Sequence, residues 1–190
     1  KPVQSADSIR QFSFMNRYTW DTTFLNLYDR CLENYRAGDT HYSGWFTDED
    51  AAFLKEIGYK PVEFFDFVED YAVGGEPSPS TAVMIAAVRR DYLDAVMKGE
   101  PSEKVILPSE LPAKSEALAG LPWLPRIIAK AEAKLRGEMD PDTMYCCGGD
   151  RAFLREHNIA PADFLRVVWA AKGDRDKVVE YVSKNSSAGA

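Results

Sequence analysis

One motif occurs twice in this chain, first as Asp50-Ala51-Ala52-Phe53-Leu54-Lys55-Glu56 and again, 100 residues later, as Asp150-Arg151-Ala152-Phe153-Leu154-Arg155-Glu156. The match continues on both sides without a gap, through the identical pairs Arg36 and Arg136, Pro61 and Pro161, Phe64 and Phe164, and Val68 and Val168. These are positions where a helix needs a capping residue, an apolar face or a proline in its first turn. A self-match at one fixed offset indicates two diverged copies of one unit.

Each copy has the pattern of about four helices. In the first copy, apolar residues recur at helical spacing over residues 24–35, and Thr47 or Asp48 can cap a short second helix. Pro61 suits the first turn of a third helix, and Ser80-Thr81 can open a fourth. Sustained strand alternation is absent from the sequence. We therefore expect an all-α fold in which two helical repeats pack pseudo-symmetrically into one bundle.

The two copies set the expected division of the chain. Residues 21–23 offer side-chain oxygens that could cap the first helix, and a stretch rich in proline and glycine separates the copies. We expect an N-terminal extension at residues 1–20, the first repeat at 21–98, a connection at 99–121, the second repeat at 122–184 and a disordered tail at 185–190.

The charge balance bears on the classes of partner. The chain has 30 acidic and 23 basic residues and a net charge of −7, whereas nucleic-acid-binding proteins normally carry a basic surplus. The longest apolar run, residues 82–88, is far shorter than the roughly 20 residues that span a bilayer. We therefore expect neither a nucleic acid nor a membrane as partner.

The three cysteines are Cys31, Cys146 and Cys147. Their number is odd, and adjacent cysteines rarely bridge to each other without backbone strain. Secreted proteins of this size more often carry an even set of spaced cysteines. We therefore expect free thiols and a reducing compartment, which predicts a cytoplasmic protein.

The segment that ends in the second copy of the motif predicts an anion or thiol site. Gly148 and Gly149 precede a short helix, whose unpaired N–H groups favour an anion, and glycine lets a ligand approach the backbone. A cysteine beside a helix N-terminus and an arginine has a lowered pKa and is a better nucleophile. The expected catalytic residues are Cys146, Cys147 and Arg151, while the alternative is that the cysteines are small buried residues beside a turn.

A basic stripe precedes this segment. Arg126, Lys130 and Lys134 are spaced so that they share one helix face, and the corresponding residues of the first copy are mostly uncharged. The stripe could face the glycine pair and complete an anion pocket, or it could be a solvated helix face. The expected substrate-binding residues are Arg126, Lys130, Tyr145, Gly148 and Gly149.

Other charged clusters have weaker functional interpretations. Glu63, Asp66 and Asp70 share a helix face and could bind a hard cation, but the spacing of oxygen ligands in a calcium loop is absent, so a solvated acidic face is the alternative. The two histidines show no zinc-ligand spacing relative to the cysteines, so we expect no metal site. The pair Arg89-Arg90 is expected to bind the acidic helix, and a phosphate site is the alternative.

The second copy resembles a bacterial family known only as a domain of unknown function. The resemblance covers residues 121–182, and the matching residues are Leu124-Pro125-Arg126, Lys130-Ala131, Gly137, Tyr145, Asp150-Arg151, Phe153-Leu154 and Phe164. It implies a bacterial source and no particular activity. The first copy departs from the pattern at most of these positions.

Two functions remain open from the sequence. The first is a small-molecule or anion-binding protein, in which Cys146 or Cys147 would act as a nucleophile or redox thiol; any cofactor is unknown. The second is a non-catalytic interaction module that would bind a partner protein through exposed Trp20, Trp45 and Trp123. Whichever holds, the residues that distinguish the second copy from the first indicate a site near residues 122–151.

Overall fold

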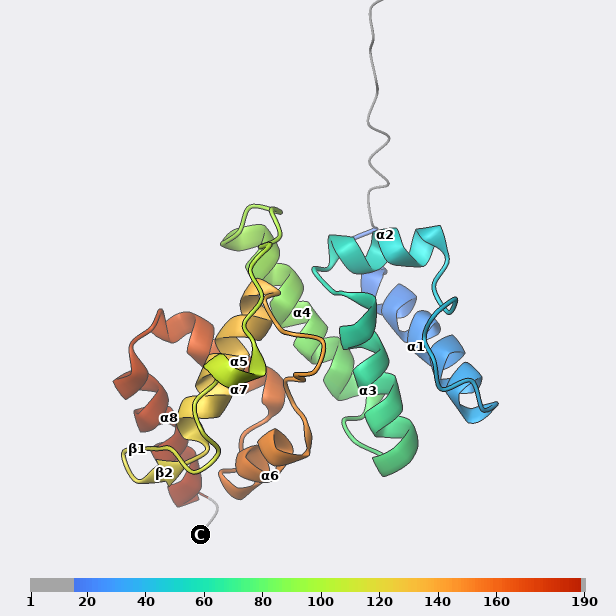
Figure 1. Cartoon of the computed structure of the whole chain (residues 1–190). Coiled ribbons are helices and arrows are strands. Elements are labelled where there is room, and N and C mark those ends of the chain that lie inside the picture. Colours follow the sequence, from blue (N-terminus) through green and yellow to red (C-terminus); the bar gives the residue numbers. More distant parts are fainter. Residues whose placement is uncertain (1–15, 189–190) are drawn as a thin grey trace, which may run out of the picture.

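The computed structural model describes residues 16–188, and α-helices dominate this range, so the expected all-α class is confirmed. Figure 1 labels the helices and colours them by their position in the sequence. The helices are α1 (Trp20–Arg36), α2 (Asp48–Glu56), α3 (Pro61–Gly74), α4 (Pro79–Ala95), α5 (Leu124–Arg136), α6 (Gly148–Glu156), α7 (Pro161–Ala171) and α8 (Arg175–Ala188).

Helix α4 lies between the two halves of the chain. In Figure 1 the helices α1 to α3 lie on one side of it and α5 to α8 on the other. Helix α4 packs on α1 and α3 from the first half and on α5 and α7 from the second. The buried apolar side chains of both halves belong to one cluster, so the halves share a single core.

The helix ends follow local sequence rules. Thr47 caps α2, because its hydroxyl accepts the N–H of Asp50 at 3.2 Å and the Asp50 carboxylate accepts the N–H of Thr47 at 2.8 Å. Pro61 and Pro161 are the first residues of α3 and α7, where a missing N–H costs nothing. Ser78 caps α4 through the N–H of Thr81, so this helix begins at Pro79, before the expected residues.

The first helix begins, and the last helix ends, at residues other than those expected from the sequence. Helix α1 begins at Trp20, one residue before the predicted capping residues 21–23. Helix α8 continues to Ala188, so the prediction of a disordered tail is wrong for residues 185–188. Residues 1–15 of the expected extension and residues 189–190 of the tail lie outside the described residues.

The connection between the halves, residues 99–121, is hydrogen-bonded to the second half. The N–H of Ile106 donates to the carbonyl of Glu138 at 2.8 Å, just after α5. A two-stranded antiparallel sheet, β1 (Ala117–Leu118) with β2 (Leu121–Pro122), and one 3₁₀ turn, η1 (Pro108–Glu110), complete the connection. Strands of two residues are too short to show alternation in a sequence.

The tryptophans expected to dock a partner are not exposed. Trp20 is 8% exposed and Trp45 is 5% exposed, and both belong to the apolar core, while Trp123 is half-buried. The guanidinium of Arg90 lies 4.2 Å from the centroid of the Trp20 ring and covers it. The expected exposure is therefore wrong for Trp20 and Trp45.

Arg89 is buried, at 1% exposure, instead of binding the acidic helix α3. Within residues 16–188 it makes no ion pair with a carboxylate. Its guanidinium lies against Gly58 and Gly137, which follow α2 and α5 in the left-handed conformation that glycine favours. A β-carbon at Gly137 would lie 2.5 Å from Nη2 of Arg89, so the glycine makes room for the buried cation.

Among residues 16–188, none of the helices combines the length and the apolar character that crossing a bilayer requires.

Candidate functional site

The charge pair of Lys130 and Asp150 is buried between α5 and α6. The Lys130 side chain is 3% exposed, that of Asp150 is fully buried, and the ammonium contacts the carboxylate Oδ2. The same carboxylate accepts the indole N–H of Trp123 at 2.9 Å and the backbone N–H of Cys146 at 2.9 Å. Because a buried charge is costly unless donors replace water, the three donors explain why Asp150 can lie in the interior.

Cys147 lies beside this pair. Nζ of Lys130 donates to Sγ of Cys147 at 3.1 Å, so one ammonium bridges the carboxylate of Asp150 and the sulfur. Cys147 is also the N-cap residue of α6, where free backbone N–H groups favour negative charge. A cation and a helix N-terminus beside a half-buried sulfur form the kind of environment in which cysteines are reactive.

Cys146 has the opposite environment. Its side chain is fully buried, and burial raises the pKa of its thiol to about 12, against the smaller opposing effect of Arg151. Its φ of 71° is left-handed, and its backbone is held on both sides: the N–H donates to Asp150, and the carbonyl accepts from Nη1 of Arg151 at 2.8 Å. The expectation of a lowered pKa is therefore wrong for Cys146.

The two glycines have different surroundings. A β-carbon at Gly149 would lie 2.4 Å from Cζ2 of Trp123, so the indole that donates to Asp150 can lie there only because Gly149 has no side chain. A β-carbon at Gly148 would have Nη2 of Arg151 as its nearest neighbour, at 3.9 Å, which is ordinary contact. Packing therefore explains Gly149 and leaves Gly148 without a structural requirement.

A cavity of about 530 Å³ opens beside Cys147. Four of the residues expected to form the site line it, namely Arg126, Lys130, Cys147 and Gly149. Acidic side chains of α3 and of the loop before α6 share the lining with basic side chains of the connection and of α5. They are Asp66, Glu69, Asp70, Asp142, Lys114, Arg126 and Lys130. We call this space the Cys147 cavity.

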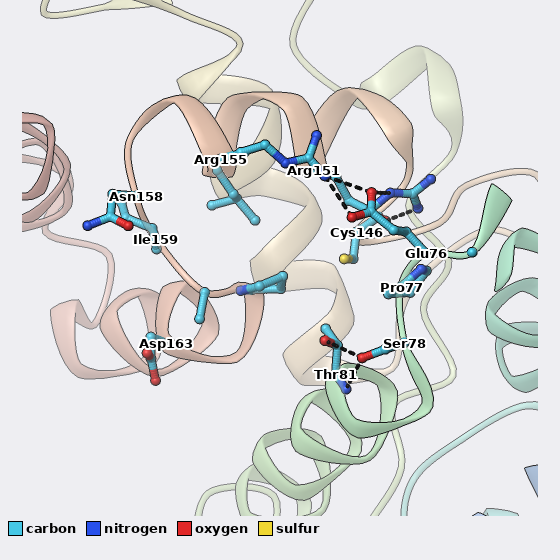
Figure 2. A pocket seen from close by; sticks show the side chains of 14 residues that line it. Glu76, Pro77, Ser78, Thr81, Cys146, Arg151, Arg155, Asn158, Ile159 and Asp163 are labelled. Carbon is cyan, nitrogen blue, oxygen red and sulfur yellow. Dashed lines mark hydrogen bonds and ion pairs between the residues drawn. The ribbon is translucent and has the colours of Figure 1, made fainter. Parts of the chain in front are cut away.

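Cys146 and Arg151 border a different cavity, of about 570 Å³, which also involves α7 and the start of α4 (Figure 2). The guanidinium of Arg151 is engaged there, with Nη1 at 2.7 Å from Asp70 and Nε at 3.7 Å from Glu76. The expected catalytic residues Cys146, Cys147 and Arg151 therefore do not converge on one cavity. The chain passes between the two spaces at the left-handed Cys146.

The basic stripe on α5 is largely buried, so its interpretation as a solvated face is wrong. Lys134 is 2% exposed, and its Nζ lies 3.0 Å from Oε1 of Glu63 on α3. Burial lowers the pKa of Lys134, while Glu63 opposes this effect. Arg126 is half-buried and donates to the carbonyl of Pro112 at 2.8 Å. Of the stripe, Arg126 and Lys130 line the Cys147 cavity, and Lys134 does not.

Tyr145 is a core residue. It is 1% exposed, and its hydroxyl donates to the carbonyl of Pro161 at 2.8 Å, which ties the loop before α6 to the start of α7. Neither Tyr145 nor Gly148 lines the Cys147 cavity, so the structure does not bring these two expected substrate-binding residues to it.

The acidic face of α3 is divided among several partners. Glu63 pairs with Lys134, and Asp70 pairs with Arg151, so the predicted cluster is not a solvated face. In the described part of the chain, no three His, Cys, Asp or Glu side chains are grouped so that they could hold a metal ion. Asp66 is the member of this face that lacks a partner.

Asp66 and Thr143 both line the Cys147 cavity; the sequence suggested Asp66 only as a possible ligand of a hard cation and did not indicate Thr143. Asp66 makes no hydrogen bond or ion pair within residues 16–188, and burial raises the pKa of its carboxyl to about 7, against the opposing effect of Lys134. Thr143 is 8% exposed, and its Oγ1 has no hydrogen-bond partner in the same range. A missing partner depends on tertiary packing, so no sequence pattern marks it.

Comparison of the chain with protein-family models found no match, and neither a curated protein nor a solved structure matches it. The resemblance of residues 121–182 to a bacterial family of unknown function stays a prediction. Function is therefore inferred from the geometry of the chain's own residues.

Gly149→Ala is expected to lower the free energy of unfolding by about 1–3 kcal/mol, because the new β-carbon displaces the Trp123 indole. Gly148→Ala is the matched control and should stay within about 0.5 kcal/mol of the wild type. Urea denaturation of both variants measures the difference. Equal effects at the two glycines would contradict the packing of Trp123 on Gly149.

Asp66→Asn is expected to stabilise the protein at alkaline pH. The folded pKa of about 7 exceeds the ordinary 3.8, so folded Asp66 holds a proton that the unfolded chain releases between these values. Wild-type stability should therefore fall as pH rises from about 4 to about 7, and the asparagine removes this loss.

The expected gain from Asp66→Asn is about 1–3 kcal/mol near pH 8 and close to zero near pH 4, by urea denaturation at both pH values. Glu33→Gln, at an exposed carboxylate of α1, is the control and should show no such dependence. A gain that is the same at both pH values would contradict the perturbed carboxyl.

Proposed function

We propose that this chain binds a small molecule in the Cys147 cavity and that Cys147 is the reactive thiol of the site. The observation that carries the proposal is the 3.1 Å contact between Nζ of Lys130 and Sγ of Cys147, at a cavity of about 530 Å³. This volume falls in the range of small-molecule sites. The cation beside the sulfur favours attack by the thiol on an electrophilic ligand.

The other predicted site residues take different parts in this proposal. Arg126 attracts an anionic group of the ligand, since it lines the cavity. Lys130 holds the sulfur of Cys147, because its buried ammonium is already paired with Asp150. Arg151 and Cys146 act as structural residues, because Arg151 is held by Asp70 and the Cys146 thiol is buried. The site is therefore smaller than the sequence predicted and contains one cysteine.

We also infer that the chain arose by duplication of one helical unit. Helices α2 and α6 both contain nine residues, and their bounds differ by the offset of the sequence repeat. The ion pair of Arg30 and Asp50 recurs at the same offset as Lys130 and Asp150. The fourth helices of the two units, α4 and α8, pack differently. Helix α4 packs on α1, α3, α5 and α7, whereas α8 packs on α7. We therefore propose the pseudo-symmetry for the first three helices of each unit.

All three cysteines are free, which fits the proposed cytoplasmic location, since reducing compartments keep thiols unpaired. The bacterial source depends on the family resemblance alone. An interaction with a partner protein has no support from the tryptophans once Trp20 and Trp45 are buried.

Alkylation of the native protein with iodoacetamide, read out at each cysteine by peptide mass spectrometry, tests the proposed function. At neutral pH, Cys147 should react about tenfold faster in the native protein than in the urea-unfolded chain. Cys31 and Cys146 should react far more slowly in the native state, because both thiols are buried. The three cysteines thus serve as internal controls for one another.

The double variant Lys130→Met/Asp150→Asn removes the ammonium without leaving a buried unpaired charge, and it should abolish the enhancement at Cys147. Circular dichroism shows whether this variant is folded. A native Cys147 that reacts no faster than in the unfolded chain, or does not react at all, would refute the reactive thiol.

A further inference from the structure

The lining of the Cys147 cavity contains both acidic and basic side chains, and this mixture bears on the class of ligand. Helix α3 contributes Asp66, Glu69 and Asp70 to the lining. Two of them are engaged, because Asp70 pairs with Arg151 at 2.7 Å and Glu69 accepts the Tyr35 hydroxyl at 3.3 Å. Asp66 is therefore the acceptor that this wall leaves for a ligand.

Thr143 gives independent support for a polar ligand group at this wall. Its Oγ1 is buried without a hydrogen-bond partner in the described range, which is unfavourable for a polar group. Thr143 and Asp66 line both the Cys147 cavity and a small pocket of about 10 Å³ next to it. A carboxylate and a hydroxyl can both accept hydrogen bonds, so together they suit a donor with several N–H groups.

The other charges around Asp66 do not supply that donor. Lys134 of α5 lowers the pKa of Asp66, but its Nζ is bound to Glu63. Glu63, Glu69 and Asp70 of α3 all raise the pKa of Asp66. The net surroundings of Asp66 are therefore burial and negative charge, which a cationic ligand group would neutralise.

The same lining also contains cations. Lys114 is exposed and has no ion pair with a carboxylate in the described residues, and Arg126 uses Nη1 to hold the Pro112 carbonyl. Both line the cavity, together with Lys130. An anionic ligand group would thus meet basic side chains while a cationic group meets Asp66.

We propose that the Cys147 cavity takes a small zwitterion of the ω-amino-acid class, with its ammonium against Asp66 and Thr143 and its carboxylate against Arg126 and Lys114. This inference rests on the part of the proposed function that makes the Cys147 cavity a small-molecule site, and it names the class of ligand. It does not require Cys147 to be reactive.

Three probes of the same chain length and different charge test this assignment: δ-aminovalerate, which is a zwitterion; glutarate, which carries two carboxylates; and cadaverine, which carries two amines. Binding to the full chain is measured by ligand-observed NMR and calorimetry. δ-Aminovalerate should bind at least about tenfold more tightly than either of the others. It is the probe that offers both an ammonium to Asp66 and a carboxylate to the basic side chains.

Variants assign the two ends of the ligand. Asp66→Asn should weaken δ-aminovalerate and cadaverine about tenfold and leave glutarate unchanged, while Arg126→Met should weaken δ-aminovalerate and glutarate and spare cadaverine. Thr143→Val should weaken the two amines less strongly. Glu33→Gln, outside the cavity, is the control and should change nothing.

Three results would each contradict the proposed zwitterionic ligand. They are equal binding of glutarate and δ-aminovalerate, an unchanged affinity of Asp66→Asn for δ-aminovalerate, and no binding of any probe. The result of these binding experiments is independent of the result of the Cys147 alkylation experiment. Charge-dependent binding together with an unreactive Cys147 supports the ligand class and refutes the proposed thiol chemistry. Fast alkylation of Cys147 without probe binding refutes the ligand class alone.

Discussion

The buried ion pair between Lys130 and Asp150 fixes the geometry of the second half of the chain. The carboxylate of Asp150 also holds the Trp123 indole and the Cys146 backbone, while the ammonium of Lys130 also reaches the sulfur of Cys147. Loss of either charge would leave the other buried and unpaired, which typically costs about 3–5 kcal/mol. The start of α5, the turn into α6 and the candidate thiol therefore depend on one another through this pair.

The same position in the first half shows what this burial adds. Arg30 pairs with Asp50, but the Arg30 side chain is 46% exposed, and exposed pairs contribute at most about 1 kcal/mol. Asp50 is used there to close the capping box with Thr47. A shared acidic residue thus serves helix capping in one half, and in the other it organises a cluster that borders a cavity.

Much of the fold follows from local rules that are visible in the sequence. Apolar spacing, the cap at Thr47 and the prolines at 61 and 161 predict the helices because each acts within a few residues. The site was less predictable. Whether Lys130 is buried, or whether Asp66 has a partner, depends on which residues of a distant helix lie opposite, and the left-handed Cys146 sends two adjacent cysteines to different cavities.

One half of the chain contains a buried, organising ion pair where the other contains a partly exposed pair, and double-mutant cycles measure this difference directly. The cycles use Lys130→Met with Asp150→Asn and Arg30→Met with Asp50→Asn, each followed by urea denaturation. The coupling free energy should reach at least about 2 kcal/mol for Lys130 with Asp150 and stay below about 1 kcal/mol for Arg30 with Asp50. Two equal couplings below about 1 kcal/mol would contradict this difference.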